Sequence, residues 1–175
     1  MSGIAGCCGE RVLFLDMEAV AHRSNVVQTV LEAEKHPSNP ILPLGDVGEW
    51  DSLQVKPWAS RSVIYDDEEQ LFKCWYTGID IGASVHTTGY AISDNGIDWI
   101  KPRLGLFEYN GNRDNNICLQ DGYGPVIKDP AEEDPSKRYK LILKQGAKHP
   151  DKIAMAYSAD GLEWSDGPVM GEPQW

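Results

Sequence analysis

The chain has 175 residues, of which 41% are hydrophobic, and this is enough for one globular domain with a sizeable core. Acidic residues outnumber basic ones by 27 to 16, so the formal net charge is −11. Such a charge disfavours binding to nucleic acid or to an anionic membrane surface. The sequence has no long apolar stretch and no signal-peptide pattern at its start, and it therefore predicts a cytoplasmic protein without a membrane partner.

Residues 1–54 are expected to be an irregular lead-in with short strands. Within it, the apolar run VLFL at residues 12–15 predicts a strand. The segment HPSNPILPLGD at residues 36–46 holds three prolines and is therefore expected to be extended. The four cysteines of the chain include no C-x-x-C pair, so neither a zinc site nor a disulfide framework is predicted. No metal and no organic cofactor is implied.

Two stretches of ten residues are nearly the same. Residues 90–99 (YAISDNGIDW) and 155–164 (MAYSADGLEW) share an alanine, a serine, a glycine and a tryptophan at equal positions. Asn-Gly and Asp-Gly favour a tight type I′ turn, because these residue types tolerate the positive φ that both central positions require. We therefore expect two β-hairpins, with Trp99 and Trp164 on the return strands.

The repeat extends upstream of the hairpins. SVIYD at residues 62–66 matches PVIKD at 125–129, and Phe72-Lys73 matches Tyr139-Lys140. Strands are predicted at residues 63–65, 71–77, 89–92 and 97–100, and in the second unit at 126–128, 138–144, 153–157 and 162–164. A four-stranded antiparallel meander is the blade of a β-propeller, so the sequence predicts an all-β fold made of such blades. Residues 55–118 would form the first blade, and residues 119–175 the second blade and the start of the next.

Two acidic turns follow from the same repeat. Asp66 and Asp129 occupy matching places after the first strand of each unit, and a group that is repeated in every blade is more typical of a structural turn than of catalysis. The acidic run at residues 66–69 is expected to be a solvated loop.

Two blades do not close a propeller, which needs at least four. We therefore expect the N-terminal part of a longer protein with a partial propeller, or a half-propeller that pairs with another copy. Open blade edges would allow self-association.

Several motifs together resemble a known family. They are RVLFLD, KHPSNPIL, SVIYDDEEQLFKCWYTG, GYAISDNGIDWIKPRLGLFEYNGNRDNNIC, RYKLILKQG and YSADGLEW. From about residue 11 onward the chain resembles the N-terminal part of the bacterial glycosidase-like five-bladed propellers, relatives of the invertase, fructanase, arabinanase and mannoside-phosphorylase group. The resemblance implies about five blades in the full-length protein, a carbohydrate ligand, and hydrolysis or phosphorolysis of a glycosidic bond.

The resemblance also implies catalytic carboxyl groups. Glycoside hydrolysis uses two of them, and in the relatives an aspartate stands just before the first inner strand. Here that place falls on residues 59–61 (ASR), none of which is acidic. Asp121 lies just before the second inner strand, near an aspartate that stabilises the transition state in the relatives, and it is the candidate catalytic residue. An aspartate ahead of two glycines is more typical of a turn than of catalysis. The general acid of the relatives would belong to a later blade.

A sugar site needs aromatic rings beside polar groups in a concave surface. Trp58 and Arg61 lie where the chain enters the first inner strand, and Tyr123 has the corresponding place in the second unit. These three are the candidate substrate-binding residues, although a core position is as good an interpretation for Trp58 and Tyr123.

Two further functions stay open. A non-catalytic carbohydrate-binding or scaffold propeller is favoured by the missing acid at residues 59–61. A sialidase-like propeller is suggested because S-x-D-G-x-x-W is close to the aspartate box of that group, although it is one residue shorter. Fold analogy carries all three functions, since propellers host many activities.

Overall fold

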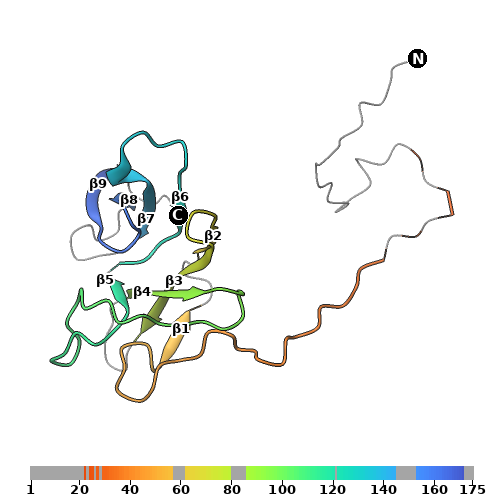
Figure 1. The fold of residues 1–175 in the computed structure, drawn as a ribbon, viewed down its shortest axis with the longest axis horizontal. Coiled ribbons are helices and arrows are strands. Elements are labelled where there is room, and N and C mark those ends of the chain that lie inside the picture. The colour runs from red at the N-terminus through yellow and green to blue at the C-terminus, as the bar shows by residue number, and fades with distance from the viewer. Residues whose placement is uncertain are drawn as a thin grey trace. The chain divides into compact units, whose positions relative to one another are not determined.

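The computed structural model describes residues 22, 24–25, 27, 29–56, 62–79, 86–120, 122–144 and 153–171 (Figure 1). The chain divides into two compact units, Met1–Lys35 and His36–Trp175, and every described strand belongs to the second unit. The prediction of an all-β fold is confirmed, because the one helical element among the described residues is the 3₁₀ turn η1, Pro135–Lys137. The strand predicted at residues 12–15 lies outside the described part of the chain.

The first sheet is antiparallel and has five strands. They are β1 (Gln54–Lys56), β2 (Ser62–Asp66), β3 (Leu71–Ile79), β4 (Thr87–Ser93) and β5 (Ile117–Leu119). Strand β3 pairs with β4 along one edge, and both β1 and β2 pair with its other edge, at opposite ends. This sheet therefore holds the predicted meander and one extra short strand.

The second sheet is a plain four-stranded meander. Its strands are β6 (Val126–Lys128), β7 (Tyr139–Lys144), β8 (Ile153–Ser158) and β9 (Ser165–Gly171), in that order across the sheet. All its strand pairs are antiparallel. Within the described residues no strand pair joins one sheet to the other, so the sheets meet only through side chains and loops.

The predicted return strands at residues 97–100 and 162–164 are wrong. The fourth strands come later, at β5 and β9, and Trp99 and Trp164 precede them. The reason is the turn, which is not type I′. Gly96 has φ +73° and Gly161 has φ +81°, but the asparagine and aspartate before them do not have positive φ.

A side-chain acceptor widens each of these turns. Asn95 Oδ1 accepts the main-chain N–H groups of residues 97 and 98, each at 2.8 Å. Asp160 Oδ1 accepts those of residues 162 and 163 at 2.8 and 3.1 Å. Because the side chain satisfies these N–H groups, the chain follows a wider loop. Pairing with the preceding strand resumes only at Ile100, as a single bridge to Ile92, and at Ser165, where β9 begins.

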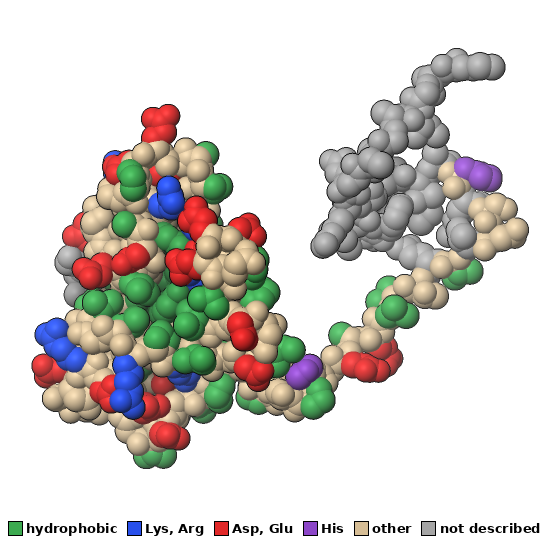
Figure 2. All heavy atoms as spheres, viewed as in Figure 1, with side chains coloured by type: hydrophobic (Ala, Val, Ile, Leu, Met, Phe, Trp, Pro, Cys, Tyr) green, Lys and Arg blue, Asp and Glu red, His purple; other side chains and the backbone are tan. Residues whose placement is uncertain are grey.

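The two sheets pack face to face through one hydrophobic core. Trp75 and Tyr90 of the first sheet contact residues of the second sheet, among them Tyr139 and Leu141, and Trp75 is fully buried. The indole of Trp75 donates to Gly161 O at 2.6 Å, which fixes the turn of the second sheet against the first. In Figure 2 hydrophobic side chains gather in the middle of the body that carries the sheets, and charged side chains lie toward its margins.

A second core lies on the opposite face of the first sheet. Leu42 and Trp50, from the proline-containing segment, pack there against side chains that include Tyr76 and Ile117. A Cβ at Gly78 or Gly89 would collide with the ring of Trp50. The two glycines therefore allow the indole to lie directly on the sheet.

Candidate functional site

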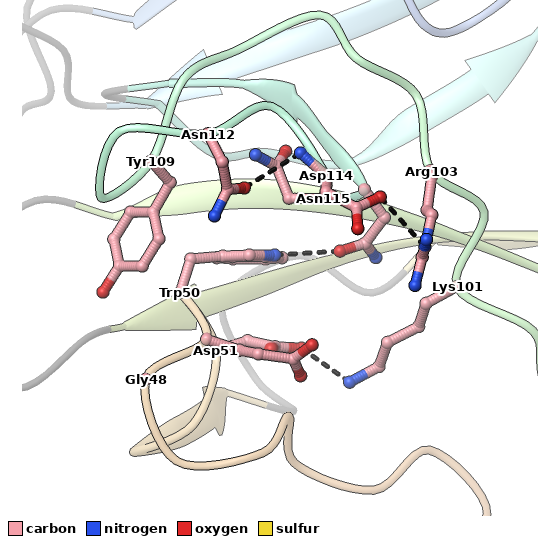
Figure 3. Close-up of a pocket in the computed structure, with 11 residues that line it drawn as sticks. Gly48, Trp50, Asp51, Lys101, Arg103, Tyr109, Asn112, Asp114 and Asn115 are labelled. Atoms are coloured by element: carbon pink, nitrogen blue, oxygen red, sulfur yellow. Dashed lines mark hydrogen bonds and ion pairs between the residues drawn. The ribbon is translucent and has the colours of Figure 1, made fainter.

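A polar hollow of about 410 Å³ lies between the turn at residues 48–51 and the loop at residues 101–116 that joins β4 to β5 (Figure 3). The turn is held on the first sheet by the indole of Trp50. The loop crosses the same sheet and returns to it at β5. Both walls are thus loops that stand on a rigid sheet, an arrangement typical of binding sites.

The floor of the hollow is a buried polar network. The Asp51 side chain is 2% exposed and accepts a hydrogen bond from Lys101 Nζ at 2.7 Å and one from the Tyr76 hydroxyl at 2.8 Å. Trp50 Nε1 donates to Asn116 Oδ1 at 2.8 Å, and Asn116 Nδ2 donates to the Tyr76 oxygen at 2.6 Å. Each of these groups has protein partners, so the floor is held in place without a ligand.

The tyrosine at the centre of this network keeps its proton. Burial, and after it the nearby Asp51 carboxylate, raises the pKa of Tyr76 well above its ordinary value. The hydroxyl therefore stays protonated at neutral pH and donates to Asp51.

The rim of the hollow carries accessible polar groups. Arg103 Nε lies 2.9 Å from Asp114 Oδ1, and their side chains are 77% and 52% exposed. Asn112 Oδ1 accepts the main-chain N–H of Asp114 at 2.9 Å, which orders the loop. The half-buried ring of Tyr109 completes this side (Figure 3). The rim thus offers donors, acceptors and one aromatic ring to a bound molecule.

Two carboxylates stand close together at the opposite wall. Glu49 accepts the main-chain N–H of Asp46 at 2.7 Å. A Cβ at Gly45 would collide with both the Glu49 and the Asp51 carboxylate, so a larger residue there would displace them. Asp51 forms an ion pair with Lys101, and Glu49 is the exposed member of the two carboxylates.

Of the residues that the sequence singled out, only Tyr123 is described. Its half-buried ring packs against His86, with the ring centroids 4.6 Å apart, and it does not line the hollow. Trp58, Arg61 and Asp121 lie outside the described residues, as do residues 59 and 60.

The hollow could not be predicted from the sequence, because its residues come from two loop segments in which apolar residues do not recur at regular spacing. The one signal was the run NGNRDNN at residues 110–116, in which amide and acidic side chains crowd between two strands. Such a run predicts a loop, but nothing in it predicts that Trp50 lies opposite.

The acidic run at residues 66–69 is only partly the solvated loop that was predicted. Asp66 and Asp129 do hold structural turns, because each accepts the main-chain N–H two residues on, at 3.1 and 3.0 Å. Asp66 is also fully buried, whereas the side chains of Glu68 and Glu69 are exposed. A burial of this kind requires cationic partners.

Those partners come from both sheets. Asp66 contacts Lys73 Nζ of β3 at 2.9 Å and Lys128 Nζ of β6 at 2.8 Å, and it accepts a hydrogen bond from the Tyr139 hydroxyl of β7 at 3.0 Å. Burial alone would raise the pKa of Asp66, but its hydrogen bonds with Lys128, Lys73 and Tyr139 outweigh this and hold the pKa well below its ordinary value. The ionised carboxylate therefore links the two sheets.

The described part of the chain has neither a candidate metal site nor a candidate membrane-spanning helix. No group of three or more His, Cys, Asp or Glu side chains in this part of the chain is placed to hold a metal ion. In the same residues, no helix has the length and apolar character needed to cross a membrane.

Comparison of the sequence with models of known protein families and with curated proteins finds no match.

Proposed function

We propose that the chain binds a carbohydrate in the hollow of Figure 3 and forms part of a glycoside-acting protein built from propeller blades. The observation that carries the proposal is the make-up of the hollow. Its floor is rigid and already satisfied, while its rim offers a guanidinium, a carboxylate, a carboxamide and a tyrosine ring.

Such a rim suits a ligand rich in hydroxyl groups. Each sugar hydroxyl both donates and accepts, so it can bind the exposed side chains of Arg103 and Asp114 and also Asn112 beside them. The ring of Tyr109 offers an apolar surface for a sugar face. The mixed charge of the site favours a neutral polar ligand over a strongly ionic one.

The two sheets support the blade assignment. The second sheet is a meander of four strands, the first contains the same meander, and the two pack face to face, as successive blades do. This arrangement agrees with the resemblance to the glycosidase-like propellers.

Carbohydrate binding is tested on an array of immobilised oligosaccharides, with two arginine variants of the same loop. Arg103→Ala removes the exposed guanidinium of the rim, and we expect it to weaken binding about tenfold, the usual effect of losing a charged hydrogen bond. Arg113→Ala is the matched control, because Arg113 is exposed and does not line the hollow. Absence of binding to any glycan, or equal losses in the two variants, would overturn the proposal.

Cleavage of a glycosidic bond is the second candidate, favoured by the two carboxylates that meet at Gly45. Against cleavage in this hollow, Asp51 is buried and bound to Lys101, so it is not accessible to a substrate. Asp121 therefore remains the candidate catalytic residue, as the resemblance implies.

Chromogenic glycosides, with and without inorganic phosphate, test this second candidate. Activity that Asp121→Asn abolishes supports cleavage as the resemblance implies, and activity that Glu49→Gln abolishes supports cleavage at the carboxylates beside Gly45. Binding without turnover of any glycoside leaves the non-catalytic carbohydrate-binding function as the conclusion.

A further inference from the structure

The face of the first sheet that packs on the second includes five side chains from the strands β2, β3 and β4. They are Ile64 of β2, Lys73 and Trp75 of β3, and Tyr90 and Ile92 of β4. Lys73, Trp75 and Tyr90 are 3%, 0% and 6% exposed, and the two isoleucines are half-buried. The second sheet covers this face.

The second sheet repeats the same face in the same register. The repeat of the sequence places Ile127, Lys140, Ile142, Met155 and Tyr157 at the five equivalent positions. In the first sheet Lys73 lies opposite Ile64 and Ile92, and in the second Lys140 lies opposite Ile127 and Tyr157. Likewise Trp75 pairs with Tyr90, and Ile142 pairs with Met155.

The equivalent face of the second sheet is covered much less by the described residues, and only at its margin, where Lys137 lies over the ring of Tyr157. Ile127 is 55% exposed and Ile142 is 43% exposed, although both belong to strands whose alternate residues form the core. Met155 and Tyr157 are half-buried beside them. Four neighbouring apolar side chains on the outside of a sheet mark an interaction surface.

The charged corner of the junction is repeated as well. Asp129 lies 2.5 Å from Lys140, and Lys140 lies 2.9 Å from Glu132, just as Lys73 binds Asp66 and Glu69 in the first sheet. The two corners differ in the groups that a neighbouring sheet adds to the aspartate.

In the first sheet these added groups come from the second sheet. Lys128 and Tyr139 reach across and complete the burial of Asp66, whose side chain is 0% exposed. Asp129 has no such cover from the described residues, and its side chain is 33% exposed. The second sheet therefore has the groups that the first sheet contributes to the junction, but not the groups that a neighbouring sheet would add.

We propose that this outer face of the second sheet is the docking surface for a further four-stranded sheet of the same repeat, joined in one polypeptide. The contacts at the existing junction indicate which residues that sheet has. It carries a lysine at the end of its first strand and a tyrosine at the start of its second, both directed at Asp129, and apolar residues that cover Ile127 and Ile142.

A second copy of the present chain fits this surface less well. The first sheet has Tyr65 and Phe72 where the second has Lys128 and Tyr139, so it brings neither the cation nor the hydroxyl that Asp129 lacks. In addition, the face of the first sheet that would have to dock is the one opposite to the second sheet, and Leu42 and Trp50 already pack on it. The inference depends on the repeat and the sheet packing and not on carbohydrate binding, so failure of the glycan experiment does not affect it.

An extended chain tests the proposal. A second copy of residues 120–171 is added after Trp175, so that the added sheet presents its own lysine and tyrosine to Asp129. We expect one cooperative unfolding transition with a higher urea midpoint than that of the original chain. Asp129→Asn in the original unit should lower the midpoint of the extended chain clearly and change that of the original chain little.

The control is Tyr139→Phe in the added copy alone, which should remove part of the gain because it deletes the hydroxyl that reaches Asp129. Two separate transitions, or an Asp129→Asn effect that is equal in both chains, would overturn the proposal. It would also be overturned if the original chain forms a stable dimer by light scattering and Ile142→Asp returns that dimer to a monomer, because the occupant would then be a second copy.

Discussion

At the scale of single residues, one glycine of the repeated motif has a role that its partner lacks. Gly161 has φ +81°, and its carbonyl accepts the Trp75 indole N–H. A Cβ at Gly161 would lie 2.6 Å from the Trp75 ring and 3.1 Å from Tyr139 Cδ1. At Gly96 the nearest atoms, those of Phe72, are 3.6 Å away. Only Gly161 therefore needs both the φ and the space.

Gly161→Ala is predicted to destabilise the chain more than Gly111→Ala. Both positions have nearly the same positive φ, +81° and +82°, so both variants lose about 1 kcal/mol to backbone strain. Nothing lies within 4 Å of a Cβ at Gly111, whereas the one at Gly161 must displace Trp75, at a further cost of about 1–3 kcal/mol. Urea unfolding of the two variants measures the difference. Equal losses would show that Gly161 does not touch the first sheet.

Some of these residue roles could be predicted from the sequence. The dipeptides at Gly96 and Gly161 predicted a turn with positive φ at both central residues, and this is confirmed for the two glycines only. They did not reveal that Asn95 and Asp160 hold the loop through their side chains, because the same dipeptides suit both turn types. The burial of Asp66 was also hidden, since Lys128 and Tyr139 stand 62 and 73 residues away in the sequence.

At the scale of elements, Asp66 at the end of β2 is the polar link between the sheets. Asp66→Asn is predicted to cost about 3–5 kcal/mol, because it leaves the Lys73 and Lys128 ammonium groups at the junction without their shared counter-charge. The matched control is Asp129→Asn, whose side chain is 33% exposed and should matter much less. The free energy of unfolding in urea measures both. Similar losses would contradict the role of Asp66 as a link between sheets.

The same carboxylate predicts a dependence on pH. The pKa of Asp66 in the folded chain lies below its ordinary value of 3.8, so its stabilisation is complete above about pH 4 and is lost as the pH falls toward the lowered pKa. Burial alone would lower the pKa of Lys73 and of Lys128, but their hydrogen bonds with carboxylates outweigh it and raise both pKa values. Both lysines therefore stay charged over this pH range.

The measurement is the difference in unfolding free energy between the original chain and Asp66→Asn as a function of pH. This difference should be constant between about pH 5 and 7 and shrink below about pH 4. If it stays unchanged down to about pH 2, the carboxylate is not the group that titrates at the junction.

Elements were predicted better than their boundaries. The first three strands of each unit lie where the alternation of apolar residues placed them. The fourth strands were placed too early, because the tryptophan of each motif resembles a strand residue but lies in the loop before the strand. Strand β1 has only three residues and gives no periodic signal.

At the scale of the whole molecule, the two sheets are copies of one repeated unit in different surroundings. Among the described residues, the repeated face of the first sheet is covered by the second sheet, whereas that of the second sheet is largely open. The sequence repeat predicted the two sheets, but it did not predict which face of each sheet is covered. Neither could it predict that Trp50 lies on the first sheet beside the hollow, since that contact joins segments without shared periodicity.

Hydroxyl-radical footprinting of the folded chain, read residue by residue by mass spectrometry, tests this central claim most directly. Equivalent positions are compared, Trp75 and Tyr90 on the covered face with Met155 and Tyr157 on the open one. We expect Met155 and Tyr157 to be modified in the native chain, and Trp75 and Tyr90 to become reactive only when the chain unfolds. Equal modification of both pairs in the native state would mean that the two sheets do not pack on each other, and equal protection would mean that the outer face is already covered.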